Sequence, residues 1–228
     1  MPLFGPVHLF LLAGIAVAAP VLAILCRRRV LGGRPLRLVL GWGLAANELV
    51  WWAFRYSHEG IHVSNLPLQL CDLTLWVTVA ACLTARPRLV EFAYLVGIAG
   101  AGMAVLTPDL WSPWPSYPAI YFFVAHGGVI AACVVLVFGG IVPPRPGAVW
   151  RVFGWVAAYA AVVGGFDAVF RVNYIYLCAK PKNVSLLNWL GPWPVYLASG
   201  AAVGLLLFWV LWLLADRANR RTAGSPAY

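Results

Sequence analysis

The chain has 228 residues, of which 63% are hydrophobic and only 10% are charged, and its mean hydropathy is +0.85. This composition excludes a soluble domain with a polar surface and predicts an all-α integral membrane protein. The formal net charge of +9 would suggest an anionic partner in a soluble protein, but basic residues of a membrane protein first report its orientation, so nucleic-acid binding is not expected.

Apolar runs separated by charged, Pro-rich or Trp-rich breaks predict a polytopic bundle of about seven transmembrane helices. In chain order they cover residues 4–26, 36–56, 67–85, 89–106, 118–140, 150–170 and 194–214. A helix needs about 20 apolar residues to cross a bilayer core of about 30 Å, so these segments leave no room for a separate soluble domain. We therefore expect a single transmembrane helical domain over residues 1–218 and a short basic cytoplasmic tail over residues 219–228.

The basic residues predict the orientation of the bundle. With the N-terminus outside, twelve of them fall on the inner side, and four remain on the outer side: Arg55, Arg171, Lys180 and Lys182. The positive-inside rule therefore places the N-terminus outside and the C-terminus in the cytoplasm. The bias toward Arg, Ala and Gly suggests a bacterial protein, so we expect it in the bacterial cytoplasmic (inner) membrane.

A few polar side chains lie inside the predicted helices, where the bilayer penalises them. Most lie toward the outer side, with further polar groups in the adjacent loops: Asn47, Glu48, Gln69, Cys71, Asp72, His126, Asp167, then Asp109, Asn173 and Lys180. This asymmetry predicts a cavity that opens outward. We expect Asp167 to pair with Arg171 one turn later, and Glu48 to contact an outer polar group such as Asn173 or Arg55.

Cys71 and His126 form the candidate catalytic pair. Cys71 lies about 6 Å below a helix start at Pro67, and His126 about 12 Å below Pro118 on the same side, so the two depths are similar. A thiol and an imidazole from facing helices can act as nucleophile and base in acyl transfer. The alternatives are a buried structural Cys and His, or a disulfide between Cys71 and Cys178.

The motifs of common cofactor sites are missing from the sequence. It contains no paired-Cys zinc spacing, no Walker-type phosphate loop and no dinucleotide fingerprint. We therefore expect neither a metal site nor a cofactor.

Five short segments carry a resemblance to a known family. They are Leu66-Pro67-Leu68-Gln69-Leu70-Cys71-Asp72, Leu106-Thr107-Pro108-Asp109-Leu110, His126-Gly127, Asn173-Tyr174-Ile175-Tyr176-Leu177 with Lys180-Pro181, and Leu190-Gly191-Pro192-Trp193-Pro194 with Tyr196. Over most of its length the chain resembles the YwaF-type integral membrane family. This family includes the animal transmembrane protein 164, an acyltransferase that loads polyunsaturated acyl chains onto ether phosphatidylethanolamine. The chain is also similar, more distantly, to the androgen-induced intramembrane hydrolases, which use Thr and His on fatty acid esters.

The resemblance implies an intramembrane acyltransferase whose substrates are membrane phospholipids and lysophospholipids. Cys71 would accept the acyl chain as a thioester, and His126 would act as general acid and base. The remaining residues would bind the substrate or orient the imidazole: Asp72 or Asp109 beside the histidine, Gln69 and Asn173 in the site, and Lys180 and Arg171 at the lipid phosphate.

Other functions stay open from the sequence. The same pair could hydrolyse a lipid ester if water replaced the acceptor. A small-solute or ion transporter would use Glu48, Asp167 and His126 as a path through the membrane. A sensor or a structural subunit is a further alternative, and the sequence does not indicate an oligomeric state.

Overall fold

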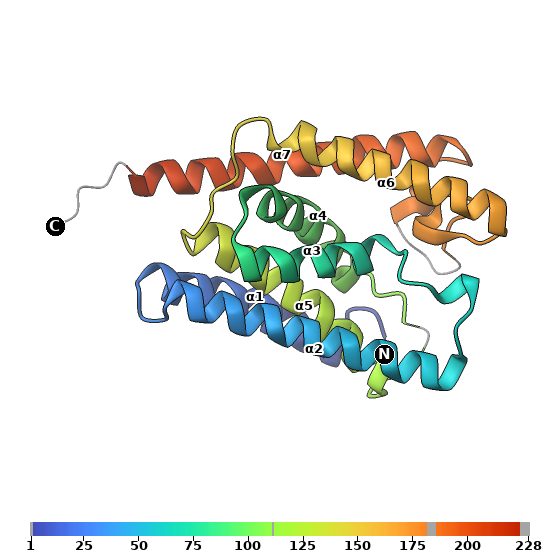
Figure 1. Ribbon diagram of the computed structural model, residues 1–228, viewed down its shortest axis with the longest axis horizontal. Coiled ribbons are helices and arrows are strands. Elements are labelled where there is room, and N and C mark those ends of the chain that lie inside the picture. The colour runs from blue at the N-terminus through green and yellow to red at the C-terminus, as the bar shows by residue number, and fades with distance from the viewer. Residues whose placement is uncertain (1, 111, 182–185, 224–228) are drawn as a thin grey trace.

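The computed structural model describes residues 2–110, 112–181 and 186–223 and shows a bundle of seven α-helices (Figure 1). Within these residues there are three short 3-10 helices and no strand. The α-helices are α1 Pro6–Arg27, α2 Gly33–Glu59, α3 Leu70–Thr84, α4 Pro87–Leu106, α5 Tyr117–Phe138, α6 Ala148–Phe170 and α7 Val195–Ala223. The 3-10 helices are η1 Val63–Asn65, η2 Tyr174–Tyr176 and η3 Leu186–Trp189.

The predicted all-helical membrane class is confirmed. Five of the helices, α1, α4, α5, α6 and α7, are long and apolar enough to cross a membrane. The shortest, α3, has 15 residues, and at 1.5 Å per residue it extends about 22 Å, less than a bilayer core of about 30 Å. In α2, which has 27 residues, charged side chains interrupt the apolar sequence. Seven crossings with the N-terminus outside therefore stay a prediction.

The start of α3 differs from the prediction and changes the position of Cys71. The sequence predicts Pro67 in the first helical turn, whereas the helix begins at Leu70 and Pro67 lies in the preceding bend. The reason is a cap, because Asp72 Oδ2 accepts a hydrogen bond from the backbone N–H of Gln69 at 3.0 Å. Cys71 is consequently the second residue of α3 rather than one turn inside it.

Three helices form the centre of the bundle. Figure 1 shows α3, α4 and α5 between the pair α6 and α7 on one side and the pair α1 and α2 on the other. α4 and α5 supply most of the fully buried apolar residues. The connection from α2 to α3 and the segment after α6 lie at one end of the bundle, which we call the Cys71 end. The connections from α1 to α2 and from α5 to α6 lie at the opposite end, which we call the Glu91 end.

The Glu91 end is held by an ionic cluster to which sequence analysis assigns no role. Glu91 of α4 is fully buried, and its carboxylate accepts hydrogen bonds from Arg145 Nε at 2.7 Å and Arg151 Nη2 at 3.0 Å. The bond to Glu91 raises the pKa of the Arg145 guanidinium. Arg27 and Arg37 donate to backbone carbonyls in the last turns of α5 and α3, where a cation is favourable. These arginines therefore connect neighbouring helices, in addition to any effect on the orientation of the protein in the membrane.

The predicted tail is in part helical. α7 continues to Ala223, and Asp216 forms a 2.8 Å ion pair with Arg220 one turn later. Residues 224–228 of the predicted tail lie outside the part of the chain that the structure describes.

Candidate functional site

Cys71 is a free and exposed thiol in the first turn of α3. Thr74 and Thr78 follow on the same face of α3; both are buried, and each donates its hydroxyl to the carbonyl four residues earlier. The face of α3 is therefore closed by packing directly beneath Cys71. Cys178 is also free, so the alternative of a Cys71–Cys178 disulfide is wrong.

Polar groups from five elements lie within electrostatic range of the thiol. Each lies close enough to Cys71 to interact with it electrostatically: Glu48 of α2, Asp72 of α3, Tyr121 of α5, Tyr159 of α6 and Tyr176 of η2. Polar groups are costly inside a membrane protein and usually mark a functional site there. The structure thus assembles a polar site around Cys71 from helices that are far apart in the sequence.

Glu48 is fully buried beside this site. Its carboxylate accepts hydrogen bonds from Trp52 Nε1 at 2.7 Å and from the Tyr121 hydroxyl at 2.5 Å. The expected contact with Asn173 or Arg55 is wrong, because Trp52 occupies the i,i+4 position and Arg55 pairs with a glutamate further along α2. Glu48 is therefore held by neutral donors.

His126 is half-buried on α5, and its tautomer follows from one hydrogen bond. Nδ1 lies 2.8 Å from the carbonyl oxygen of Phe122. A carbonyl only accepts, so Nδ1 carries the proton and Nε2 of the neutral ring has a free lone pair. The carbonyl of Phe122 thus orients the imidazole through Nδ1, and orientation by Asp72 or Asp109 stays a prediction. Nε2 is the nitrogen that can accept a proton.

Cys71 and His126 lie at similar depth, as the sequence predicts. A Cβ on Gly97 of α4 would lie 2.9 Å from Val129 of α5 and 3.5 Å from Thr74 of α3, so these two residues face the same glycine. Cys71 precedes Thr74 by three residues and His126 precedes Val129 by three, which places both about 4.5 Å nearer the Cys71 end. Among the hydrogen bonds of the described residues, none joins Cys71 to His126.

The segment after α6 turns across the Cys71 end. Asp167 accepts the backbone N–H of Tyr174 with both carboxylate oxygens, at 3.1 and 2.9 Å. Its predicted pairing with Arg171 is wrong, because Arg171 ends α6 in the left-handed conformation (φ 55°) and leaves the helical i,i+4 geometry. Arg171 is exposed at the rim.

η2 is held beside the start of α3 by two contacts. The Ile175 N–H donates to Gln69 Oε1 at 3.0 Å, and the Tyr176 hydroxyl lies 3.4 Å from Asp109 Oδ2. Burial and the Asp109 carboxylate raise the pKa of Tyr176 to about 12. The hydroxyl therefore stays protonated and donates a hydrogen bond to the carboxylate. Ile175 adopts φ 45°, a strained conformation for a β-branched residue. Gln69 and Asp109 thus fix the wall of the site.

The last two predicted site residues flank η2, with Asn173 directly before it and Lys180 after it. Asn173 Oδ1 accepts the backbone N–H of Cys178 at 2.9 Å and so closes the loop on itself. Lys180 Nζ lies 5.3 Å from the ring centre of Tyr196, a cation–π distance. Gln69, Asp72 and Asp109 thus make contacts at the start of α3 and η2, whereas Asn173 and Lys180 contact their own loop and Tyr196, and Arg171 ends α6.

A metal is not accommodated by the residues that the structure describes, since no group of three or more His, Cys, Asp or Glu side chains gathers there. The residues that sequence reasoning misses at the site are tyrosines: Tyr121, Tyr159 and Tyr176. Their rings suit an apolar segment, so hydropathy does not separate them from packing residues. Their electrostatic interaction with Cys71 becomes visible only in the fold, because they come from α5, α6 and η2.

Comparison with known proteins identifies one family. No curated protein and no solved structure matches the chain. The sequence model of the TMEM164 family matches residues 3–213, which is nearly the whole chain and includes every residue of the site. The protein belongs to the TMEM164 family.

Proposed function

We propose that this protein is an intramembrane acyltransferase that acts on phospholipids and lysophospholipids, with Cys71 as nucleophile and His126 as general acid and base. The observation that carries the proposal is the exposed Cys71 thiol among polar groups of five elements in an apolar bundle. The resemblance to acyltransferases of the family supports the same chemistry. The site faces the outer side of a bacterial cytoplasmic membrane in this proposal.

In the first step His126 Nε2 takes the proton of the Cys71 thiol, and Sγ attacks the carbonyl carbon of a phospholipid ester. A C–S bond forms and the ester C–O bond breaks. The proton passes from His126 to the departing glycerol oxygen, so a lysophospholipid leaves and an acyl thioester remains. The free lone pair on Nε2 supports this role.

In the second step His126 takes the proton from the hydroxyl of a lysophospholipid acceptor. The acceptor oxygen attacks the thioester carbonyl, a new ester C–O bond forms, and the C–S bond breaks. The proton returns to Sγ of Cys71, which regenerates the starting site. Water in place of the lysophospholipid would give a free fatty acid, so hydrolysis is the alternative outcome of the same pair.

The missing hydrogen bond between Cys71 and His126 is compatible with this mechanism. Catalytic hydrogen bonds are often long in an empty site and tighten when substrate binds. Lys180 and Arg171 lie at the rim, where a phosphate would reach a cation. The transport alternative has less support, because Glu48, Asp167 and His126 are each hydrogen-bonded to their own neighbours.

The proposal is tested with the purified full-length protein in nanodiscs of phosphatidylethanolamine with a labelled acyl chain and added lysophospholipid. Cys71→Ala should abolish transfer, and mass spectrometry of the wild-type protein should find an acyl adduct on Cys71. His126→Ala should slow adduct formation by about 10²–10⁴-fold, the usual contribution of an acid–base residue.

The matched control is Cys178→Ala, because this cysteine is also free and exposed but is not one of the groups around Cys71. It should leave transfer unchanged. Full activity of Cys71→Ala, together with the absence of an adduct, would rule out the nucleophile. Release of free fatty acid in place of a new phospholipid would assign the protein as a hydrolase.

A further inference from the structure

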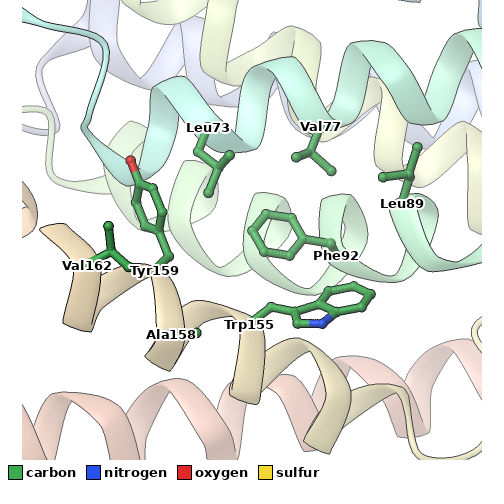
Figure 2. A pocket seen from close by; sticks show the side chains of 8 residues that line it. All are labelled: Leu73, Val77, Leu89, Phe92, Trp155, Ala158, Tyr159 and Val162. Carbon is green, nitrogen blue, oxygen red and sulfur yellow. The ribbon is translucent and has the colours of Figure 1, made fainter.

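A groove of about 430 Å³ lies between α3, α4 and α6 (Figure 2). Its α3 residues Leu73 and Val77 are each about 100° around the helix from the buried Thr74 and Thr78. Aliphatic and aromatic side chains line it: Leu73 and Val77 from α3, Leu89 and Phe92 from α4, and Trp155 and Tyr159 from α6. Figure 2 shows Tyr159 at one end of the groove and Leu89 and Trp155 toward the other. The groove is thus an apolar channel between helices that extends away from the start of α3.

One end of the groove adjoins the Cys71 site. Leu73 follows Cys71 by two residues, so the two lie about 3 Å apart along the helix axis but about 160° apart around it, and the link between groove and thiol is made by Tyr159. The Tyr159 hydroxyl donates to the carbonyl of Leu68 at 2.9 Å, directly before α3, and it interacts electrostatically with Cys71. Tyr159 therefore contributes its ring to the groove and its hydroxyl to the surroundings of the thiol.

Packing closes the core face of α3 to a chain bound at Cys71. On the core face of α3, Thr78 and Cys82 have no exposed surface, so a hydrocarbon chain cannot run down that side. On the other side the groove is open to its surroundings, since Trp155 is 39% and Val162 is 73% exposed. In a membrane this opening faces the hydrocarbon of the bilayer, from which a lipid chain can enter sideways.

We propose that this groove binds the acyl chain of the phospholipid that reacts at Cys71, an inference that rests on the proposed function. The apolar lining matches a hydrocarbon chain, and the polar end at Tyr159 matches the ester. The α6 residues from 155 to 162 extend about 10 Å, so the groove contacts the chain several carbons beyond the carbonyl. It would therefore select the length and shape of the transferred chain.

The first test fills the groove. Ala158→Trp places an indole among the lining residues, whereas Ala157→Trp is a matched control at an exposed α6 position outside the lining. Ala158→Trp should lower transfer of a long acyl chain relative to a short one by at least about tenfold, the discrimination expected from displacing one or two methylene groups. The control should keep the wild-type ratio. An unchanged ratio in Ala158→Trp would overturn the groove assignment.

The second test does not depend on catalysis. Phosphatidylethanolamine with a photoreactive diazirine in the middle of one acyl chain is illuminated with the Cys71→Ala variant in nanodiscs. Cross-links should map to α6 and to the start of α4, and Ala158→Trp in the same background should remove them. Cross-links of this pattern without transfer by the wild-type protein would reject the proposed function but keep the groove. Transfer without such cross-links, or cross-links to a lipid that does not exchange with added lipid, would reject the groove.

Discussion

Two glutamates are fully buried in this bundle, and their partners are opposite in kind. Glu91 accepts from two guanidinium groups, those of Arg145 and Arg151. Glu48 accepts from the neutral Tyr121 and Trp52. Both carboxylates satisfy their hydrogen bonds, so burial and hydrogen bonding alone do not distinguish them.

The difference lies in what surrounds each carboxylate. The Glu91 cluster joins α4, α6 and the loop before α6, and sequence and structure assign no nucleophile to that end of the bundle. Glu48 and its partner Tyr121 both interact electrostatically with the exposed thiol of Cys71. At the Glu91 end two guanidinium groups therefore neutralise the carboxylate, whereas at the Cys71 end Glu48 has only neutral hydrogen-bond donors. The contrast makes predictions that can be tested separately for each end.

The largest expected effect is an all-or-none difference in labelling between the two ends. In a background in which Cys71 and Cys178 are replaced by Ala, single cysteines at Ser64 and Pro146 report the Cys71 end and the Glu91 end, and both positions are exposed. The positive-inside rule predicts that an impermeant maleimide labels Ser64→Cys in intact cells and Pro146→Cys only after the membrane is opened. If only Pro146→Cys is labelled in intact cells, the orientation of the protein is the opposite of the predicted one.

At the Glu91 end the sequence does not predict which residues before α6 are exposed. The neighbouring Ala148 looks like a loop residue but is fully buried at the start of α6. The helices themselves were predictable from their long apolar runs, and Pro in the first turn marks α1, α4 and α5, although Pro67 does not start α3. Cys71 and His126 were also predictable as polar residues in apolar segments. The partners of Glu48 and Glu91 were not, because pairing across helices depends on rotation and depth that one-dimensional hydropathy does not contain.

The next prediction breaks the cluster at the Glu91 end. Replacing both Arg145 and Arg151 by Ala leaves Glu91 buried without a cation, which should lower the free energy of unfolding and the midpoint of thermal unfolding. Each single replacement should cost less, because the other guanidinium remains. Adding Glu91→Gln to the double variant should restore part of the loss by removing the buried charge. Thermal unfolding in detergent measures all four proteins, and a double variant as stable as wild type would show that the cluster contributes little.

The smallest expected effect compares the two glutamates directly through Glu48→Gln and Glu91→Gln. Gln at position 48 keeps one acceptor oxygen for Tyr121 or Trp52 but not both, so it should lower the free energy of unfolding by about 1–2 kcal/mol. Tyr121 then loses its fixed orientation beside Cys71, and kcat for acyl transfer should fall by about tenfold, equivalent to about 1.4 kcal/mol, while KM changes little. Glu91→Gln should lower stability without changing kcat, because its cluster lies at the far end of the bundle. If kcat falls equally in both variants, the effect of Glu48 is one of stability, and the functional difference between the two ends is lost.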